Sequence, residues 1–357
     1  MGSPMRTLGP SIWSVSDGRA GNASQVRALV HALGEPSRWL RIAHIMGEAH
    51  RAEPMVLTPR APWTWLAADK WPAPLSALPK AQRSLFAPPW PTLWIAAGRR
   101  SAAFTKLVRE RSEGKTFTVH ILDPQINASN FDLLVVPEHD GLSGANVVTT
   151  AGSPAHFSAD MLEETGQAFA PLADETRRSV VVVLGGHSKT HKFTPEAAAR
   201  LEAQLRKLAA EGWRLRITTS RRTPIEIITQ FRKMADETGG QFWSGSQDGP
   251  NPYLAWLMFS AAAIVTEDSA NMLSEAAWHG LPVHIAPLEG QAPKFTRLHE
   301  SLIARGAARR FTGTLDQWTY EPLREADRVA DLIVTKLLER YPAPAFTSGV
   351  AAPDWLS

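Results

Sequence analysis

A short stretch near residue 270 combines side chains that can bind a phosphorylated ligand. Four polar residues follow the apolar run at residues 261–265, namely Thr266, Glu267, Asp268 and Ser269. The helical pattern that follows carries Asn271 and Glu275 four residues apart, with Met272 between them, so the three side chains can share one face of a helix. Hydroxyls, carboxylates and a helix N-terminus at one place suit the phosphate and hydroxyl groups of a nucleotide. The same residue types also make an ordinary helix cap, with Asp268 or Ser269 at the N-cap.

The elements around this stretch form a strand, a helix and a second strand. The run at residues 261–265 has the length of a buried strand of a parallel sheet. The helix should end at Gly280 and Pro282, and residues 283–286 can form the next strand. The polar residues then lie at the carboxyl end of a strand, where open α/β sheets bind ligands.

Three further junctions in the second half of the chain place polar groups after predicted strands. Residues 179–184 are followed by Gly185, Gly186 and Ser188, residues 214–218 by Ser220, Arg221 and Arg222, and residues 241–243 by a loop with Asn251 and Tyr253. Glycine N–H groups and a serine hydroxyl can surround one phosphate, and the two arginines can neutralise another. The arginines can equally be the solvated start of a helix.

The first half of the chain shows a similar alternation of strands and helices. Strands are predicted at residues 11–15, 39–43, 93–97, 116–122, 131–136 and 146–149, and helices at residues 25–33 and about 101–111. Glycine-rich or basic residues that can approach a ligand follow two of these strands, namely Gly18, Gly21 and Asn22, and then Gly98, Arg99 and Arg100. The alternation predicts a doubly wound parallel sheet in each half, with the ligand residues along one edge.

Residues 54–92 differ from the rest because proline and tryptophan recur through them. Proline at this density permits only short helices and turns. The tryptophans can pack this irregular segment onto its own domain. They can also form an apolar surface for a lipid-linked acceptor or for the membrane interface.

Length and composition favour two domains in a reducing compartment. With 357 residues, we expect one domain at residues 1–165 and a second at residues 166–323. A net charge of +3 gives no dense basic face for nucleic acid, and the chain has no cysteine. The N-terminus lacks the apolar core of a signal peptide, and no window is apolar enough for a membrane span. His187 and His191 have no matching carboxylates nearby, so no metal site is predicted.

Motifs through most of the chain resemble those of the elongated-mitochondria (mitochondrial fission) family. They comprise residues 17–22 with Gln25, 96–100, 117–119 with 123–124, 136–140, 185–188, 218–224, 251–253, and 265–269 with Met272, Glu275 and Ala276. The resemblance implies a GT-B-like fold, in which two Rossmann-like domains face a cleft, and a helix at residues 324–341 that packs back across the first domain. The plant namesake of the family is known as a fission factor that helps to recruit a dynamin-like protein. The bacterial relatives look like glycosyltransferases of envelope polysaccharide or lipid.

The resemblance implies transfer of a sugar from a nucleotide-diphosphate sugar to a polysaccharide or lipid acceptor, with neither metal nor cofactor. The diphosphate is then expected on Gly185, Gly186, Ser188, Ser220 and Arg221, the base near residues 251–253 and the ribose on Glu275. An inverting reaction needs a base, for which Asp17 is the first choice and His139 or Glu138 the second. Asp17 can equally be a turn residue that bonds its own backbone.

Two other functions remain open for such a chain. It can be a GT-B-shaped scaffold that recruits a membrane-remodelling partner and catalyses nothing, or an enzyme like the nucleotide-sugar 2-epimerases, which use this fold without an acceptor. We expect a cytoplasmic protein that binds no nucleic acid, with peripheral contact to the inner face of the membrane as a further option.

Overall fold

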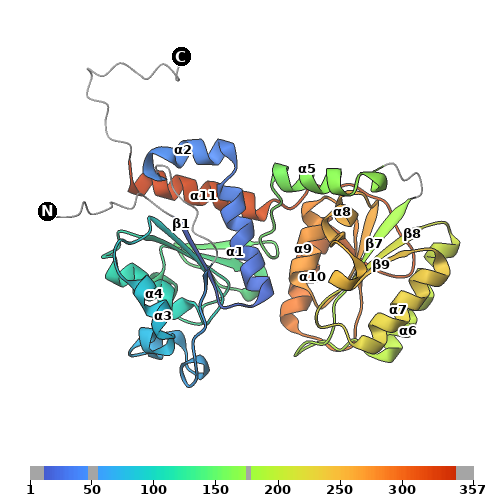
Figure 1. The fold of residues 1–357 in the computed structure, drawn as a ribbon, viewed down its shortest axis with the longest axis horizontal. Coiled ribbons are helices and arrows are strands. Elements are labelled where there is room, and N and C mark those ends of the chain that lie inside the picture. The colour runs from blue at the N-terminus through green and yellow to red at the C-terminus, as the bar shows by residue number, and fades with distance from the viewer. Residues whose placement is uncertain (1–11, 47–54, 174–177, 343–357) are drawn as a thin grey trace, which may run out of the picture.

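Two parallel β-sheets, one in each half of the chain, form the framework of the protein (Figure 1). The computed structural model describes residues 12–46, 55–173 and 178–342. Each sheet has six strands, and buried apolar clusters lie on both faces of each sheet. The predicted architecture of two doubly wound α/β halves is therefore confirmed.

The N-terminal sheet is entirely parallel, in the order β2-β1-β3-β4-β5-β6. Its strands are β1 (Ile12–Ser16), β2 (Met55–Val56), β3 (Leu93–Ala97), β4 (Phe117–Ile121), β5 (Leu133–Pro137) and β6 (Val147–Thr150). Because side chains alternate along a strand, Ile12 and Ile95 pack in the cluster under α1 (Ala20–Leu33). Val15 and Trp94 pack on the opposite face, in the cluster with α4 (Ala102–Arg111).

The strand predicted at residues 39–43 is wrong, because helix α2 (Pro36–Met46) spans this segment. Ile42 and Met46 are fully buried, whereas Leu40 is 74% exposed. Buried residues four apart indicate a helix with one apolar face, and the exposed Leu40 interrupts the alternation that a strand would need. Pro36 also suits the first position of a helix.

The segment between β2 and β3 contains only short helices, as its prolines predict. They are η1 (Trp63–Trp65), η2 (Ala68–Lys70), η3 (Pro74–Ala77), α3 (Lys80–Arg83) and η4 (Ser84–Phe86). Trp71 and Phe86 are buried with Phe104 of α4, and their rings make edge or tilted contacts with it. This packing attaches the segment to the face of its own sheet.

The C-terminal sheet is also parallel, in the order β12-β11-β10-β7-β8-β9. Its strands are β7 (Ser179–Leu184), β8 (Arg214–Thr219), β9 (Gln241–Trp243), β10 (Ala262–Thr266), β11 (Val283–Ala286) and β12 (Ala308–Arg310). Helices α6 (Pro195–Ala210) and α7 (Ile225–Thr238) supply the core of one face. Helices α8 (Tyr253–Met258), α9 (Ala270–Trp278) and α10 (Pro293–Ala304) cover the other.

The positions of two helices, α11 and α5, indicate where the boundary between the two domains lies. The last helix, α11 (Glu325–Arg340), lies beside α1 and α2 in the N-terminal lobe (Figure 1) and buries Val329 and Ile333 in its core. Helix α5 (Ala159–Ala168) packs against α8 of the C-terminal lobe. Because residue 165 falls inside α5, we propose a domain boundary just before this helix. None of the helices in the described ranges is both long and apolar enough to cross a membrane.

Candidate functional site

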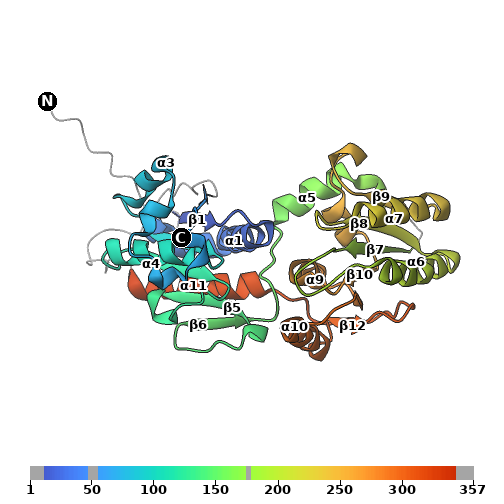
Figure 2. The same cartoon turned by 90° about the horizontal axis from the view of Figure 1, so that it is seen from below.

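A pocket of about 870 Å³ lies between the two lobes. Figure 2 shows α1 on the side of the N-terminal lobe that faces the second lobe. Its wall is formed by the start of α1, the carboxyl ends of β8 and β9, and the start of α9. The lining residues are Gly18, Arg19, Ala20, Gly21, Ser24, Arg27, Val183, Thr218, Thr219, Ser220, Arg221, Arg222, Trp243, Asn251, Tyr253, Asp268, Ser269, Ala270, Asn271, Met272 and Glu275. Residues 268–272 and Glu275 of the predicted stretch therefore line one pocket, whereas Thr266 and Glu267 do not.

The N-termini of α1 and α9 both open on this pocket, and neither has a side-chain cap. Neither helix has an acidic residue in its first turn. Some helices of the described chain have a side-chain cap, as α6 does, where Thr194 accepts a hydrogen bond from the Ala197 N–H and Glu196 follows. Helices α4, α7, α10 and α11 lack one, as α1 and α9 do. Uncapped N-termini leave N–H groups and a partial positive charge available to an anion. The capping interpretation of Ser269 is thus wrong, because it occupies the N-cap position without making the cap bond.

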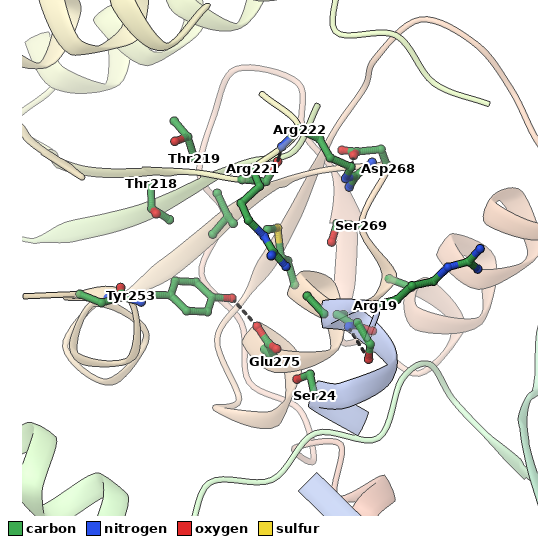
Figure 3. A pocket seen from close by; sticks show the side chains of 18 of the residues that line it. Arg19, Ser24, Thr218, Thr219, Arg221, Arg222, Tyr253, Asp268, Ser269 and Glu275 are labelled. Carbon is green, nitrogen blue, oxygen red and sulfur yellow. Dashed lines mark hydrogen bonds and ion pairs between the residues drawn. The ribbon is translucent and has the colours of Figure 1, made fainter. Parts of the chain in front are cut away.

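The two arginines at the end of β8 have different surroundings. Arg222 donates from Nη2 to Asp268 Oδ2 at 2.7 Å. Arg221 has neither a hydrogen bond nor an ion pair within the described part of the chain, and its side chain extends into the pocket toward the start of α1 (Figure 3). Arg221 is therefore the side chain of this pair that is available to a ligand.

Asp268 is an internal anion held by its own chain. Its Oδ1 accepts from Thr266 Oγ1 at 2.7 Å, and its Oδ2 accepts from the Gly186 N–H at 3.1 Å and from Arg222. The side chain is fully buried. This carboxylate occupies the space beside Gly185 and Gly186 that sequence reasoning reserved for a phosphate.

Glu275 and Tyr253 form a hydrogen-bonded pair on the opposite wall (Figure 3). Tyr253 Oη donates to Glu275 Oε2 at 2.8 Å. Burial raises the pKa of Glu275 to about 7, although the Tyr253 hydrogen bond and the positive charge of Arg27 oppose this shift. Burial and the neighbouring Glu275 raise the pKa of Tyr253, so its hydroxyl stays a donor. Glu275 can thus present an oxygen to ligand hydroxyls, more strongly when it is ionised.

Direct contacts hold the starts of α1 and α9 side by side. Gln25 Nε2 donates to Asn271 Oδ1 at 3.1 Å, and Asn271 Nδ2 donates to the Gly21 carbonyl at 3.3 Å. The Ser153 N–H donates to Ser274 Oγ at 2.9 Å. These bonds bring one N-terminus from each lobe to the same pocket.

Residues 20–337 match the family described as mitochondrial fission ELM1. The chain belongs to the mitochondrial fission ELM1 family. It is 27% identical over 278 residues to the mitochondrial fission protein ELM1 of Arabidopsis thaliana, a match that covers 70% of the chain and 65% of that protein. It is 26% identical over 281 residues to an uncharacterized protein of Rickettsia prowazekii, covering 68% of the chain and 79% of the relative. The predicted family membership is confirmed.

Solved structures from other families share the fold of this ELM1 family member. The UDP-GlcNAc 2-epimerase of Neisseria meningitidis, bound to UDP-GlcNAc, superposes with a TM-score of 0.53 at 11% identity, covering 92% of the chain and 100% of the epimerase. MurG of Acinetobacter baumannii gives a TM-score of 0.50 at 12% identity, covering 92% of the chain and 99% of MurG. Together with the two parallel sheets, these matches confirm the GT-B-like fold.

The predicted phosphate loop after β7 does not line the pocket. The Gly185 N–H donates to Thr266 Oγ1 at 2.7 Å, and the Gly186 N–H is bonded to Asp268. Ser188 Oγ accepts from the N–H groups of Thr190 and His191. The glycines allow close approach of Asp268 and of the Arg222 backbone, so we no longer assign Gly185, Gly186 or Ser188 to a phosphate.

The three residues predicted as bases also lie outside the pocket. Asp17 Oδ1 accepts from Asn22 Nδ2 at 2.8 Å and from the Arg19 N–H at 3.3 Å, as expected of a turn residue. Glu138 Oε1 is 2.6 Å from Nη2 of Arg305, the residue that follows α10. His139 is buried against α10, and this burial lowers its pKa to about 4. Asp17 therefore shapes the loop before α1, and the other two join the lobes.

Some of the predicted cleft residues line the pocket, and the others lie behind it or outside it. Gly18 and Gly21 line the pocket, whereas Asn22 holds Asp17. Gly98, Arg99 and Arg100 lie outside it. Arg99 Nη1 donates to Gln125 Oε1 at 3.1 Å. Gly98 packs against Asp17 and Asn22, in the loop and first turn of α1.

An alanine at Gly98 is expected to lower the free energy of unfolding by about 2 kcal/mol. Gly98 has a φ of +89°, and an added Cβ would collide with Asn22 Nδ2 and lie 3.2 Å from Asp17 Oδ2. Gly141→Ala is the matched control, because its φ is +72° and no atom lies within 4 Å of the added Cβ. The free energy of unfolding of the control should fall by only about 1 kcal/mol, because the alanine adds backbone strain and no collision. Equal losses in chemical denaturation would contradict this account of the loop.

Several pocket residues were not among the predicted site residues. The polar and aromatic ones are Arg19, Ser24, Arg27, Thr218, Thr219 and Trp243. Ser24 and Arg27 follow Gly21 at intervals of three residues, so the helical period of α1 could have revealed them. Trp243 is the last residue of β9, and apart from this position nothing in the sequence indicates that it lines a pocket. In the described ranges, the structure brings together no cluster of three or more metal-binding side chains.

Proposed function

We propose that the chain binds a nucleotide-diphosphate sugar in the pocket between its lobes and transfers the sugar to a lipid or polysaccharide acceptor. This proposal rests on two helix N-termini without side-chain caps and on Arg221, which has no partner among the described residues; all three meet in one pocket. The volume of the pocket, about 870 Å³, suits a nucleotide sugar. The fold shared with an epimerase bound to UDP-GlcNAc supports the same ligand class.

In this proposal the diphosphate lies between the starts of α1 and α9. The N–H groups of both helices and the guanidinium of Arg221 bind its oxygens. Glu275 accepts hydrogen bonds from the ribose hydroxyls. The nucleobase then lies near Asn251 and Trp243, which line the pocket next to Tyr253.

The reaction that we infer requires stabilisation of the leaving group. An acceptor hydroxyl oxygen bonds to the anomeric carbon of the sugar while the bond from that carbon to the diphosphate breaks. The leaving diphosphate gains negative charge, which the two helix N-termini and Arg221 stabilise without a metal. Its terminal phosphate has a pKa near 6 and can take up the proton of the hydroxyl.

Two alternatives use the same pocket differently. A 2-epimerase-like enzyme needs the donor and no acceptor, and an epimerase bound to UDP-GlcNAc shares the fold of this chain. A scaffold binds a partner without turnover, which fits the fission role in the name of the Arabidopsis relative. The match spans 65% of that relative's length, so its role transfers to this chain only as a proposal.

Incubation with a panel of nucleotide sugars, with and without membrane lipid extract, distinguishes the three functions. A transferase releases nucleoside diphosphate only when acceptor is present. An epimerase changes the sugar without acceptor, and a scaffold does neither. Release that needs lipid extract and disappears in Arg221→Ala would support our proposal, and turnover without acceptor would replace it with the epimerase.

A further inference from the structure

The segment between β2 and β3 carries one tryptophan that its packing leaves exposed. Trp71 and Phe86 attach the segment to the domain, and Trp63 packs partly buried against the same cluster. Trp65 is 78% exposed and its neighbour Leu66 is 43% exposed. The Trp71 indole donates to the Leu66 carbonyl at 3.4 Å, so this apolar pair projects from an ordered backbone.

Positive charge surrounds this pair in the sequence. Residues 55–92 contain four basic residues, Arg60, Lys70, Lys80 and Arg83, and the single acidic residue Asp69. All four basic side chains are exposed, and none forms an ion pair within the described residues. The net charge of the segment is therefore +3, equal to that of the whole chain.

The segment begins next to the pocket. Strand β2, which precedes it, pairs with β1, and Val56 at its end is partly exposed. A Cβ on the pocket residue Gly18 would lie 3.1 Å from Val56 Cγ1. Strand β2 thus connects the pocket rim to the segment that carries Trp65.

We propose that residues 57–86 dock the chain on the surface of an anionic lipid bilayer, with Trp65 and Leu66 entering the interface. An indole prefers the boundary between headgroups and acyl chains, where its ring is apolar and its N–H finds a partner. Each basic residue near an anionic surface adds to the attraction. This docking goes beyond the sugar transfer and does not depend on it, although it brings lipid acceptors to the pocket.

Vesicle sedimentation tests the docking. The full chain should bind vesicles of phosphatidylglycerol and phosphatidylethanolamine, bind phosphatidylcholine vesicles more weakly, and dissociate as salt rises. The double variant Trp65→Ser/Leu66→Ser should bind anionic vesicles about tenfold more weakly. Its thermal unfolding should be unchanged, because both side chains are exposed in the folded state.

Ile225→Ser is the matched control, because Ile225 is 66% exposed on α7 of the other lobe. It should bind anionic vesicles as the wild type does. Absence of vesicle binding by the wild type, or equal weakening in the control, would overturn the docking. Nucleotide affinity measured on the same variants stays unchanged in this proposal, so a failed docking is distinguishable from a failed donor site.

Discussion

Arg221→Ala is expected to bind nucleoside diphosphates about 100-fold more weakly than the wild type. Arg221 extends into the pocket, and the described chain offers it no carboxylate partner. Its guanidinium is therefore available to the diphosphate, and removing it leaves the two helix N-termini together with the pocket residues Arg19 and Arg27 as the positive groups. Isothermal titration calorimetry measures the effect.

The stability of Arg221→Ala should match that of the wild type, since the side chain is exposed. Arg200→Ala controls for the loss of one positive charge, because Arg200 is exposed on α6 and lies outside the pocket. Its affinity should be that of the wild type. If Arg200→Ala and Arg221→Ala weaken binding equally, the effect is only long-range charge and the assignment of Arg221 fails.

Arg222→Ala should behave differently from its neighbour. It removes the 2.7 Å partner of Asp268, whose side chain is fully buried. Since Arg222 itself is 41% exposed, solvent screens part of this interaction, and we expect a loss of about 1–2 kcal/mol in the free energy of unfolding. Chemical denaturation of the two single variants separates a ligand contact from a structural contact.

Glu275→Gln is expected to weaken nucleotide binding about tenfold at pH 8 and to remove part of its pH dependence. The pKa of Glu275 is raised to about 7 by burial. A carboxylate accepts hydrogen bonds from ribose hydroxyls more strongly than a protonated carboxyl does, so wild-type affinity should rise as the pH increases through 7. The glutamine keeps an oxygen for the Tyr253 hydroxyl and has no such transition.

The ligand phosphates also titrate near this pH, so the comparison between the two proteins isolates Glu275. Calorimetric titrations from about pH 5 to about pH 9 give both profiles. Parallel profiles for wild type and variant would show that Glu275 does not touch the ligand.

Stability should depend on the pH in the opposite sense. The folded state holds the Glu275 proton more tightly than the unfolded state, because the folded pKa of about 7 exceeds the usual 4.5. The stabilising contribution is complete below pH 4.5 and is lost as the pH rises through 7. The wild type should therefore lose stability relative to Glu275→Gln between these values, by about 1.4 kcal/mol for each pKa unit.

The sequence was sufficient for the fold because most strands are continuous apolar runs. The runs at residues 179–184 and 261–265 became β7 and, shifted by one residue, β10 of a sheet covered on both faces. The strand predicted at residues 39–43 was wrong because the apolar residues there follow a helical period, which is not visible in a window of five residues.

The site was predicted best where one short stretch supplies several groups. Asp268, Ser269, Met272 and Glu275 all line the pocket. The predicted phosphate loop does not line the pocket, and Asp268, more than eighty residues away in the chain, accepts the Gly186 N–H. A glycine pair shows that something approaches closely, and only the structure shows that it is a carboxylate of the same chain.

The structure gives the predicted bases other partners for a related reason. Glu138 and His139 follow a strand, as many catalytic residues do, yet Arg305 at the end of α10 pairs with Glu138, and Arg297 of α10 donates to the carbonyl of the buried His139. Contacts between lobes have no local sequence signal. For Asp17, the turn alternative was visible in the sequence and is what the structure shows.

A crystal structure with bound nucleoside diphosphate tests the central claim most directly, namely that the diphosphate binds between the starts of α1 and α9. We predict phosphate oxygens within hydrogen-bond distance of the backbone N–H groups of both helices and of the Arg221 guanidinium. A diphosphate bound to the loop at residues 185–188, or anywhere outside the pocket between the lobes, would contradict the account.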